Sequence, residues 1–227
     1  MRKRTSRRSE ILRQNPYFLY NKYHSSNLRG IPDMKAFTAV DREMKLISWK
    51  NTKYNATKNL DKGVHFFADD QDFERVYNKP EPAAKKLAQY KYILTPDFSM
   101  YTDMPLVVQE NNVFRNRWCG AFWQQDCGLD FVIPTVCWST PESYEFAFLG
   151  LEKGTAVALS TIGTNNKETK SLFLAGYNEL IRQVEPIAIY CYGTPFTEMQ
   201  GEIITIPYIF DDFKKMIAGG MKNGWTW

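Results

Sequence analysis

Three aspartates follow apolar runs in this sequence and are the residues best suited to acid–base chemistry. Asp69 and Asp70 end the run at residues 65–70, and Asp97 ends the run at residues 92–97. Carboxylates held close together raise one another's pKa, which lets one of them act as a general acid or base, and together they can hold a hard divalent cation. Aspartate also caps helices and closes turns. Catalysis, cation binding and capping therefore all stay open for these three residues.

Hydroxyl side chains accompany the ends of the same apolar runs and of three further runs, at residues 131–135, 156–161 and 187–194. Parallel strands are buried on both faces and read as continuous apolar runs, and their carboxyl ends open onto the crevice where α/β proteins bind ligands. We therefore expect one shared rim with the ligand-binding candidates Thr95, Ser99, Thr135, Ser160, Thr161, Thr164, Tyr192 and Thr194. The turn at residues 160–165 suits a phosphate or other anion at a helix start, but helix capping explains it equally, and it lacks the lysine of a P-loop.

A basic segment opens the chain. Six basic residues and one acid, Glu10, lie within residues 1–13, and the nucleic-acid candidates among them are Arg2, Lys3, Arg4, Arg7 and Arg8. Such a run attracts polyanions through phosphate contacts, whereas the alternative is an ordinary solvated tail. Aromatic residues at positions 17–23 either stack on exposed bases or pin the arm onto the core.

Other reactive residue types are few or poorly placed. The four cysteines show no paired spacing and are expected to be reduced, and with two histidines the chain has too few ligands for a zinc site, although a carboxylate-bound divalent cation stays compatible. His65 lies near the start of the first expected strand, which favours a core or edge histidine. Arg115 and Arg117 either bind a carboxylate or phosphate or pair with acids on a helix surface.

The order of patterns predicts an α/β domain at residues 61–227, preceded by a basic and aromatic arm or cap at residues 1–60. Helical stripes alternate with the five apolar runs, a sixth strand is expected at residues 202–208, and Asn165 is expected to cap a helix that ends before Pro186. Strand spacings of about 25 to 40 residues suit βαβ units. The expected fold has five or six mainly parallel strands, as a partial barrel or an open sheet.

Composition excludes a membrane protein. The chain has 227 residues, of which 44% are hydrophobic and 24% charged, and no apolar run approaches the roughly 20 residues that cross a bilayer. The amino terminus has no apolar segment behind its charges and does not resemble a secretory signal. We expect the protein to stay in the cytoplasm of the cell that makes it, without a membrane partner.

Three motifs point to a family. The run LTPDFSMY at residues 94–101, VIPT at residues 132–135 with Trp138, and ALSTIGT at residues 158–164 resemble an uncharacterised family of bacteriophages and mobile elements, whose members are sometimes labelled as associated with rolling-circle replication. The resemblance spans roughly residues 60–215 and implies a phage or integrated-element origin and a host cytoplasmic setting. Nicking initiators generally need a histidine pair beside a tyrosine, and two isolated histidines do not supply it. A replication role would then be accessory, a binding role, or carboxylate-based.

Three functions follow as hypotheses. The first is a phage-type protein that engages nucleic acid through its basic arm and holds a nucleotide or phosphate at the rim. The second is a carboxylate-dependent enzyme that uses Asp69, Asp70 or Asp97 on a small phosphorylated or glycosidic substrate. The third is an inhibitor that binds a host protein. No motif names the reaction, the ligand or the oligomeric state.

Overall fold

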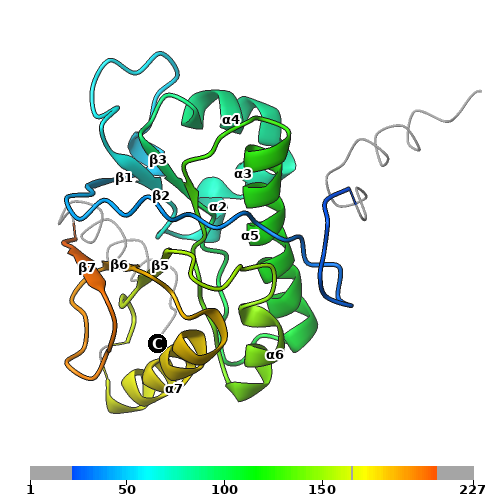
Figure 1. Ribbon diagram of the computed structural model, residues 1–227, viewed down its shortest axis with the longest axis vertical. Helices are drawn as coiled ribbons and strands as arrows, with labels where there is room; N and C mark the ends of the chain where they lie inside the picture. Colours follow the sequence, from blue (N-terminus) through cyan, green and yellow to red (C-terminus); the bar gives the residue numbers. More distant parts are fainter. Residues whose placement is uncertain (1–21, 165, 209–227) are drawn as a thin grey trace, which may run out of the picture.

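The computed structural model describes residues 22–164 and 166–208 (Figure 1). Within them lie two all-parallel sheets, in strand orders β1-β2-β3-β4 and β5-β6-β7. The strands are β1 (Leu46–Ser48), β2 (Gly63–His65), β3 (Tyr92–Leu94), β4 (Val132–Ile133), β5 (Val157–Ser160), β6 (Ile189–Tyr192) and β7 (Ile203–Ile206). A parallel bridge between Thr135 and Ala158 links the sheets. All strand ends therefore point the same way, which confirms the parallel α/β prediction in its open-sheet form.

Helices connect most of the strands. Between the strands of the first sheet lie η2 (Trp49–Asn51), α2 (Asp70–Phe73), α3 (Arg75–Asn78), α4 (Pro80–Leu87) and α5 (Leu106–Gln125). Between β4 and β6 lie η3 (Pro141–Ser143), α6 (Tyr144–Ala147) and α7 (Lys167–Val184). Helices α3, α4 and α5 cover one side of the first sheet, and α7 lies against the second (Figure 1). The cap of α7 is Asn166, whose side chain accepts a hydrogen bond from the Thr169 N–H. The expected cap, Asn165, lies outside the described residues.

Side-chain alternation along the short strands separates the cores. Ile93 packs with the helices of the first sheet, whereas the next residue, Leu94, packs in a cluster shared by both sheets. Ala158 and Tyr190 join that shared cluster from the second sheet. Burial on both faces explains the unbroken apolar runs in the sequence.

Two elements differ from the expectation. The first sheet begins with β1, which comes from the segment assigned to an arm or cap. Strand β2 ends at His65, so the histidine lies at the carboxyl end of its strand and the expected strand at residues 65–70 is wrong. The first residue of β2 is Gly63, where a Cβ would lie 2.9 Å from the Leu46 side chain. This close pairing with β1 depends on the tertiary structure and cannot be predicted from the apolar run.

The segment before β1 crosses the molecule (Figure 1). Phe37 accepts a backbone hydrogen bond from Ala156, and the Asp41 N–H lies 2.9 Å from the Tyr190 hydroxyl. The segment therefore ties the two sheets at the amino ends of the strands. Among the helices of the described ranges, none is long and apolar enough to cross a membrane.

Candidate functional site

The carboxyl ends of β2, β3 and β4 bring polar groups together. Asp70 opens α2 after β2, Asp97 and Ser99 lie in the connection after β3, and Cys137 follows β4. Arg115 reaches this region from α5. We call these five residues the Asp97 site.

Asp97 is a half-buried residue with one carboxyl oxygen held away from water. Its Oδ1 is buried and has no hydrogen-bond partner among the described residues. The pKa of Asp97 is raised to about 7, mainly by burial; a hydrogen bond from the Cys137 thiol opposes the rise, and the negative charge of Asp70 adds to it. The Cys137 thiol also lies 3.5 Å from the Phe98 carbonyl oxygen, and burial together with Asp97 raises its pKa well above the ordinary value. Burial therefore favours the protonated thiol of Cys137 over the thiolate that a cysteine nucleophile needs.

Asp70 fixes the connection that carries Asp97. Its Oδ1 accepts hydrogen bonds from the Ser99 hydroxyl at 2.9 Å and from the Ser99 N–H at 3.2 Å. Burial raises the pKa of Asp70, while these bonds and the charge of Arg115 oppose the rise. The Arg115 guanidinium lies 3.8 Å from the centroid of the Phe98 ring, and its nearest acid is Glu74 at 3.5 Å. Both aspartates therefore hold protons more tightly than exposed aspartates do.

A stripe of amides on α5 holds the same connection, residues 95–105. Gln109, Asn112 and Asn116 are three and four residues apart, so they lie on one helix face. Gln109 donates to the carbonyl oxygens of Tyr101 (3.1 Å) and Met104 (2.8 Å), Asn112 to that of Ser99 (2.8 Å) and Asn116 to that of Pro96 (2.7 Å). The Thr95 hydroxyl donates to Asn116 Oδ1 at 2.8 Å. These bonds replace the ladder bonds that a strand would supply.

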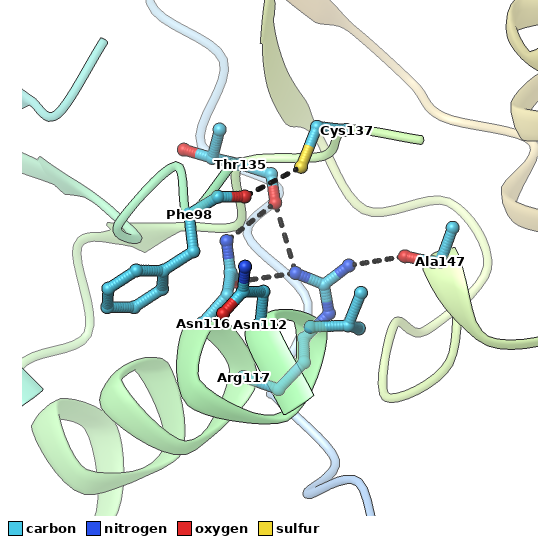
Figure 2. A pocket seen from close by; sticks show the side chains of 8 residues that line it. Phe98, Asn112, Asn116, Arg117, Thr135, Cys137 and Ala147 are labelled. Atoms are coloured by element: carbon cyan, nitrogen blue, oxygen red, sulfur yellow. Dashed lines mark hydrogen bonds between the residues drawn. The ribbon is translucent and has the colours of Figure 1, made fainter. Parts of the chain in front are cut away.

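Arg117 lies fully buried behind the site (Figure 2). It donates to the carbonyl oxygens of Thr135 (3.0 Å), Ala147 (2.9 Å) and Leu149 (3.0 Å) and to Asn116 Oδ1 (2.5 Å). Burial lowers the pKa of Arg117 to about 10, so it keeps its charge at neutral pH. No acid pairs with it among the described residues, so the expected surface ion pair is wrong for Arg117.

A small cavity separates Arg117 from the connection after β3. It has room for about one water molecule. Its lining residues are Phe98, Asn112, Val113, Asn116, Arg117, Thr135, Cys137 and Ala147. Figure 2 shows the Asn116 and Arg117 side chains turned toward the Thr135 carbonyl oxygen. The Thr135 hydroxyl oxygen is buried here without a hydrogen-bond partner in the described part of the chain.

The hydroxyl candidates divide between the two sheets. Thr95, Ser99 and Thr135 lie at or behind the Asp97 site. Ser160, Thr161, Thr164, Tyr192 and Thr194 lie at the carboxyl ends of β5 and β6. The Ser160 hydroxyl donates to the Tyr192 carbonyl oxygen at 3.2 Å and the Thr164 hydroxyl to that of Thr161 at 2.6 Å. The Thr164 hydroxyl binds the backbone of its own turn, whereas the Ser160 hydroxyl binds the backbone of the adjacent strand β6.

An aromatic cluster joins the ends of β2 and β6. The Tyr192 ring stacks on Phe67 at 5.1 Å and lies 4.6 Å from the ring of His65, measured between centroids. His65 is fully buried, and burial lowers its pKa to about 3. A neutral, packed histidine fits the expected core role, although its place in the strand differs.

The remaining candidates lie apart from the Asp97 site. Asp69 is exposed and its side chain makes no capping hydrogen bond to α2. The arm residues Arg2, Lys3, Arg4, Arg7 and Arg8 lie outside the described residues. In residues 22–164 and 166–208, no three side chains of the His, Cys, Asp or Glu types are grouped to hold a metal ion.

The sequence did not single out Asn112, Asn116 or the Asp97–Cys137 contact. The sequence does carry a signal for the amide stripe, because the amides at positions 109, 112 and 116 are spaced three and four residues apart, as on one helix face. Nothing local signalled Cys137, because it meets Asp97 only when β3 and β4 pair.

The fold and the Asp97 site define a parallel α/β protein with a buried carboxyl group at the carboxyl ends of its strands. The chain belongs to the family described as "Domain of unknown function (DUF4417)", which matches residues 23–213.

Two similar proteins come from bacteriophages. The "Gene 1 protein" of Mycobacterium phage L5 is 39% identical over 174 residues, which are 75% of this chain and 74% of the relative. The "Gene 1 protein" of Mycobacterium phage D29 is 38% identical over 173 residues, which are 75% of this chain and 63% of the relative. No solved structure matches the chain. These findings confirm the resemblance to an uncharacterised phage family.

Proposed function

We propose that this member of a phage protein family carries out carboxylate-dependent chemistry at the Asp97 site, with Asp97 as the group that moves a proton. The supporting observation is the buried, unpartnered Oδ1 of Asp97 beside a second carboxyl group, Asp70. Strongly perturbed acids cluster at functional sites, since a buried carboxyl is otherwise costly to keep. A group with a pKa near 7 both donates and accepts protons at neutral pH.

The neighbouring residues suit supporting roles. Asp70 holds Ser99 in place, and the amide stripe of α5 fixes the connection that carries Asp97. Arg115 places a positive charge beside the Asp70 carboxyl. Three residues of the site, Asp70, Asp97 and Ser99, are only half-buried, and the cavity behind them has room for about one water molecule. A substrate would therefore approach these residues from the rim. A small phosphorylated or glycosidic substrate fits this combination of acid, cation and hydroxyl groups.

Activity of an Asp97→Asn variant tests this function. A panel of nitrophenyl phosphates and nitrophenyl glycosides is offered to the full chain between pH 5 and pH 9. We expect turnover of at least one substrate with a pH limb near 7, and a loss of about 100-fold or more in Asp97→Asn, since general acid–base groups contribute about that much. Asp130→Asn, an exposed aspartate before β4, is the matched control and keeps the wild-type rate. Equal rates in Asp97→Asn and wild type, or no turnover across the panel, would refute the proposal.

A second function, engagement of nucleic acid by the basic arm, is favoured by the charge of residues 1–13. The arm would supply phosphate contacts in the host cytoplasm, as an accessory to replication. A full-length chain with Arg2, Lys3, Arg4, Arg7 and Arg8 replaced by Gln should bind single-stranded DNA with a lower affinity and a shallower salt dependence. Unchanged affinity and salt slope would contradict a role for the arm.

A further inference from the structure

A basic and aromatic surface lies away from the Asp97 site, where the connection after β1 packs on α4. The residues from Trp49 to Lys62 include four lysines and one acid, Asp61. Gln89, just after α4, accepts a hydrogen bond from the Ala56 N–H at 3.0 Å and donates to the Lys53 carbonyl oxygen at 3.3 Å. The connection loops out beside α4 in Figure 1. We call Trp49, Lys53, Tyr54, Arg75, Lys85 and Lys86 the lysine–aromatic surface.

Lys86 lies buried beneath the centre of this surface, with 5% of its area exposed. Its Nζ lies 3.8 Å from the centroid of the buried Trp49 ring and 5.8 Å from that of Tyr54. Arg75 lies over the same Trp49 ring at 5.9 Å. Two cations therefore share one indole ring.

The charge of this pair is not neutralised by nearby acids. Among the described residues, neither Lys86 nor Arg75 has an acidic group within 4.0 Å, whereas Lys91, Lys153 and Lys170 each have one. Burial and the charge of Arg75 lower the pKa of Lys86 to about 8, so the ammonium remains mostly charged at pH 7. Because no acid of the protein neutralises these two cations, their positive potential attracts anions from outside the protein.

Tyr54 adds a flat apolar surface beside these charges. Tyr54 is 54% exposed, whereas the nearby Trp49 ring is buried. Lys53 and Lys85 are exposed on either side, one on the connection and one on α4. Single-strand binders combine such rings, which stack on bases, with cations that follow the phosphates. An acidic polypeptide offers the charges but no base to stack.

The geometry points to the lysine–aromatic surface as a binding site for single-stranded nucleic acid, with phosphates on the exposed Lys53 and Lys85 and a base on Tyr54. This inference rests on the proposed engagement of nucleic acid and gives it a second contact, separate from the arm.

The test measures binding of a fluorescein-labelled oligo-dT strand to the full chain by anisotropy, over a range of salt concentrations. The variant Lys53→Glu with Lys85→Glu is compared with Lys153→Glu plus Lys167→Glu, which makes the same change in net charge at exposed lysines of the second sheet region. We expect the first pair to weaken binding about tenfold or more and to reduce the log–log salt slope by about 1.4, and the second to change affinity by no more than about twofold. Tyr54→Ala should weaken binding by about fivefold or more, and Tyr54→Phe should bind as wild type does.

The outcomes separate the surface from the function. If wild type does not bind oligo-dT, both the nucleic-acid function and this site are wrong. If wild type binds but the surface variants match their controls, the site is wrong while the arm keeps its role. If the surface variants weaken binding of poly-glutamate as much as that of oligo-dT, and Tyr54→Ala affects neither, the partner is an acidic polypeptide and the inference is overturned. Far-UV circular dichroism confirms that each variant is folded.

Discussion

Asp97 links the chemistry of the site to the stability of the protein. Its pKa is about 7 in the folded chain and 3.8 in an ordinary aspartate. The folded state therefore binds more protons than the unfolded state between these values, and stability present below about pH 4 is lost as the pH rises through 7. The whole difference amounts to at most about 4 kcal/mol.

Urea unfolding at several pH values tests this. Between pH 5 and pH 8 we expect the wild-type free energy of unfolding to fall by about 2 to 3 kcal/mol more than that of Asp97→Asn, because the amide cannot ionise. Asp130→Asn should follow wild type, since its carboxylate is exposed. Parallel curves for wild type and Asp97→Asn would show that Asp97 titrates as an ordinary aspartate, and would remove the basis of its proposed role.

At the scale of elements, α5 is more than a cover for the sheet. It is a 20-residue helix with a buried polar face, and its amides take the place of strand pairing for residues 95–105. Asn116 is the most connected of them, because it binds Pro96, Thr95, Thr135 and Arg117 at once. Removing one member of such a buried network costs the most stability when its partners are left without a hydrogen bond.

Asn116→Ala should therefore lower the free energy of unfolding by about 2 to 3 kcal/mol, since carbonyl and hydroxyl groups lose a buried partner. The matched control is Asn111→Ala, an exposed asparagine on the same helix, which should change stability by no more than about 0.5 kcal/mol. Denaturant titration measures both. A loss in Asn116→Ala as small as the control's would mean that the connection is held by other contacts.

At the scale of the whole molecule, two open sheets share one core. They meet at a single described bridge, Thr135 to Ala158, but share a core in which Leu94 and Ile133 pack with residues such as Tyr190. The segment at residues 22–45 adds hydrogen bonds across the same boundary. The sheets share few backbone hydrogen bonds, but they have a common core. Because unfolding one sheet would expose that core, we expect both sheets to unfold cooperatively.

Native-state hydrogen exchange tests this cooperativity. The slowest amides of β3 and of β6 should exchange with the same free energy, equal to that of global unfolding. A difference of more than about 2 kcal/mol would instead mark the two sheets as separate cooperative units. The Lys53→Glu, Lys85→Glu and Tyr54→Ala variants should leave this pattern unchanged, because these three side chains are exposed.

The sequence determined the strand direction and with it the meeting of Asp70 and Asp97. Burial on both faces makes a parallel strand a continuous apolar run, and residues that follow such runs must gather at one edge. Tertiary structure alone decided that β1 joins the sheet, that Arg117 is buried among carbonyl groups, that the Ser160 and Thr164 hydroxyls bind neighbouring backbone, and that Lys86 lies over Trp49. Each of these depends on a neighbour that is distant in the chain or on a local backbone turn, and residue periodicity encodes neither of them.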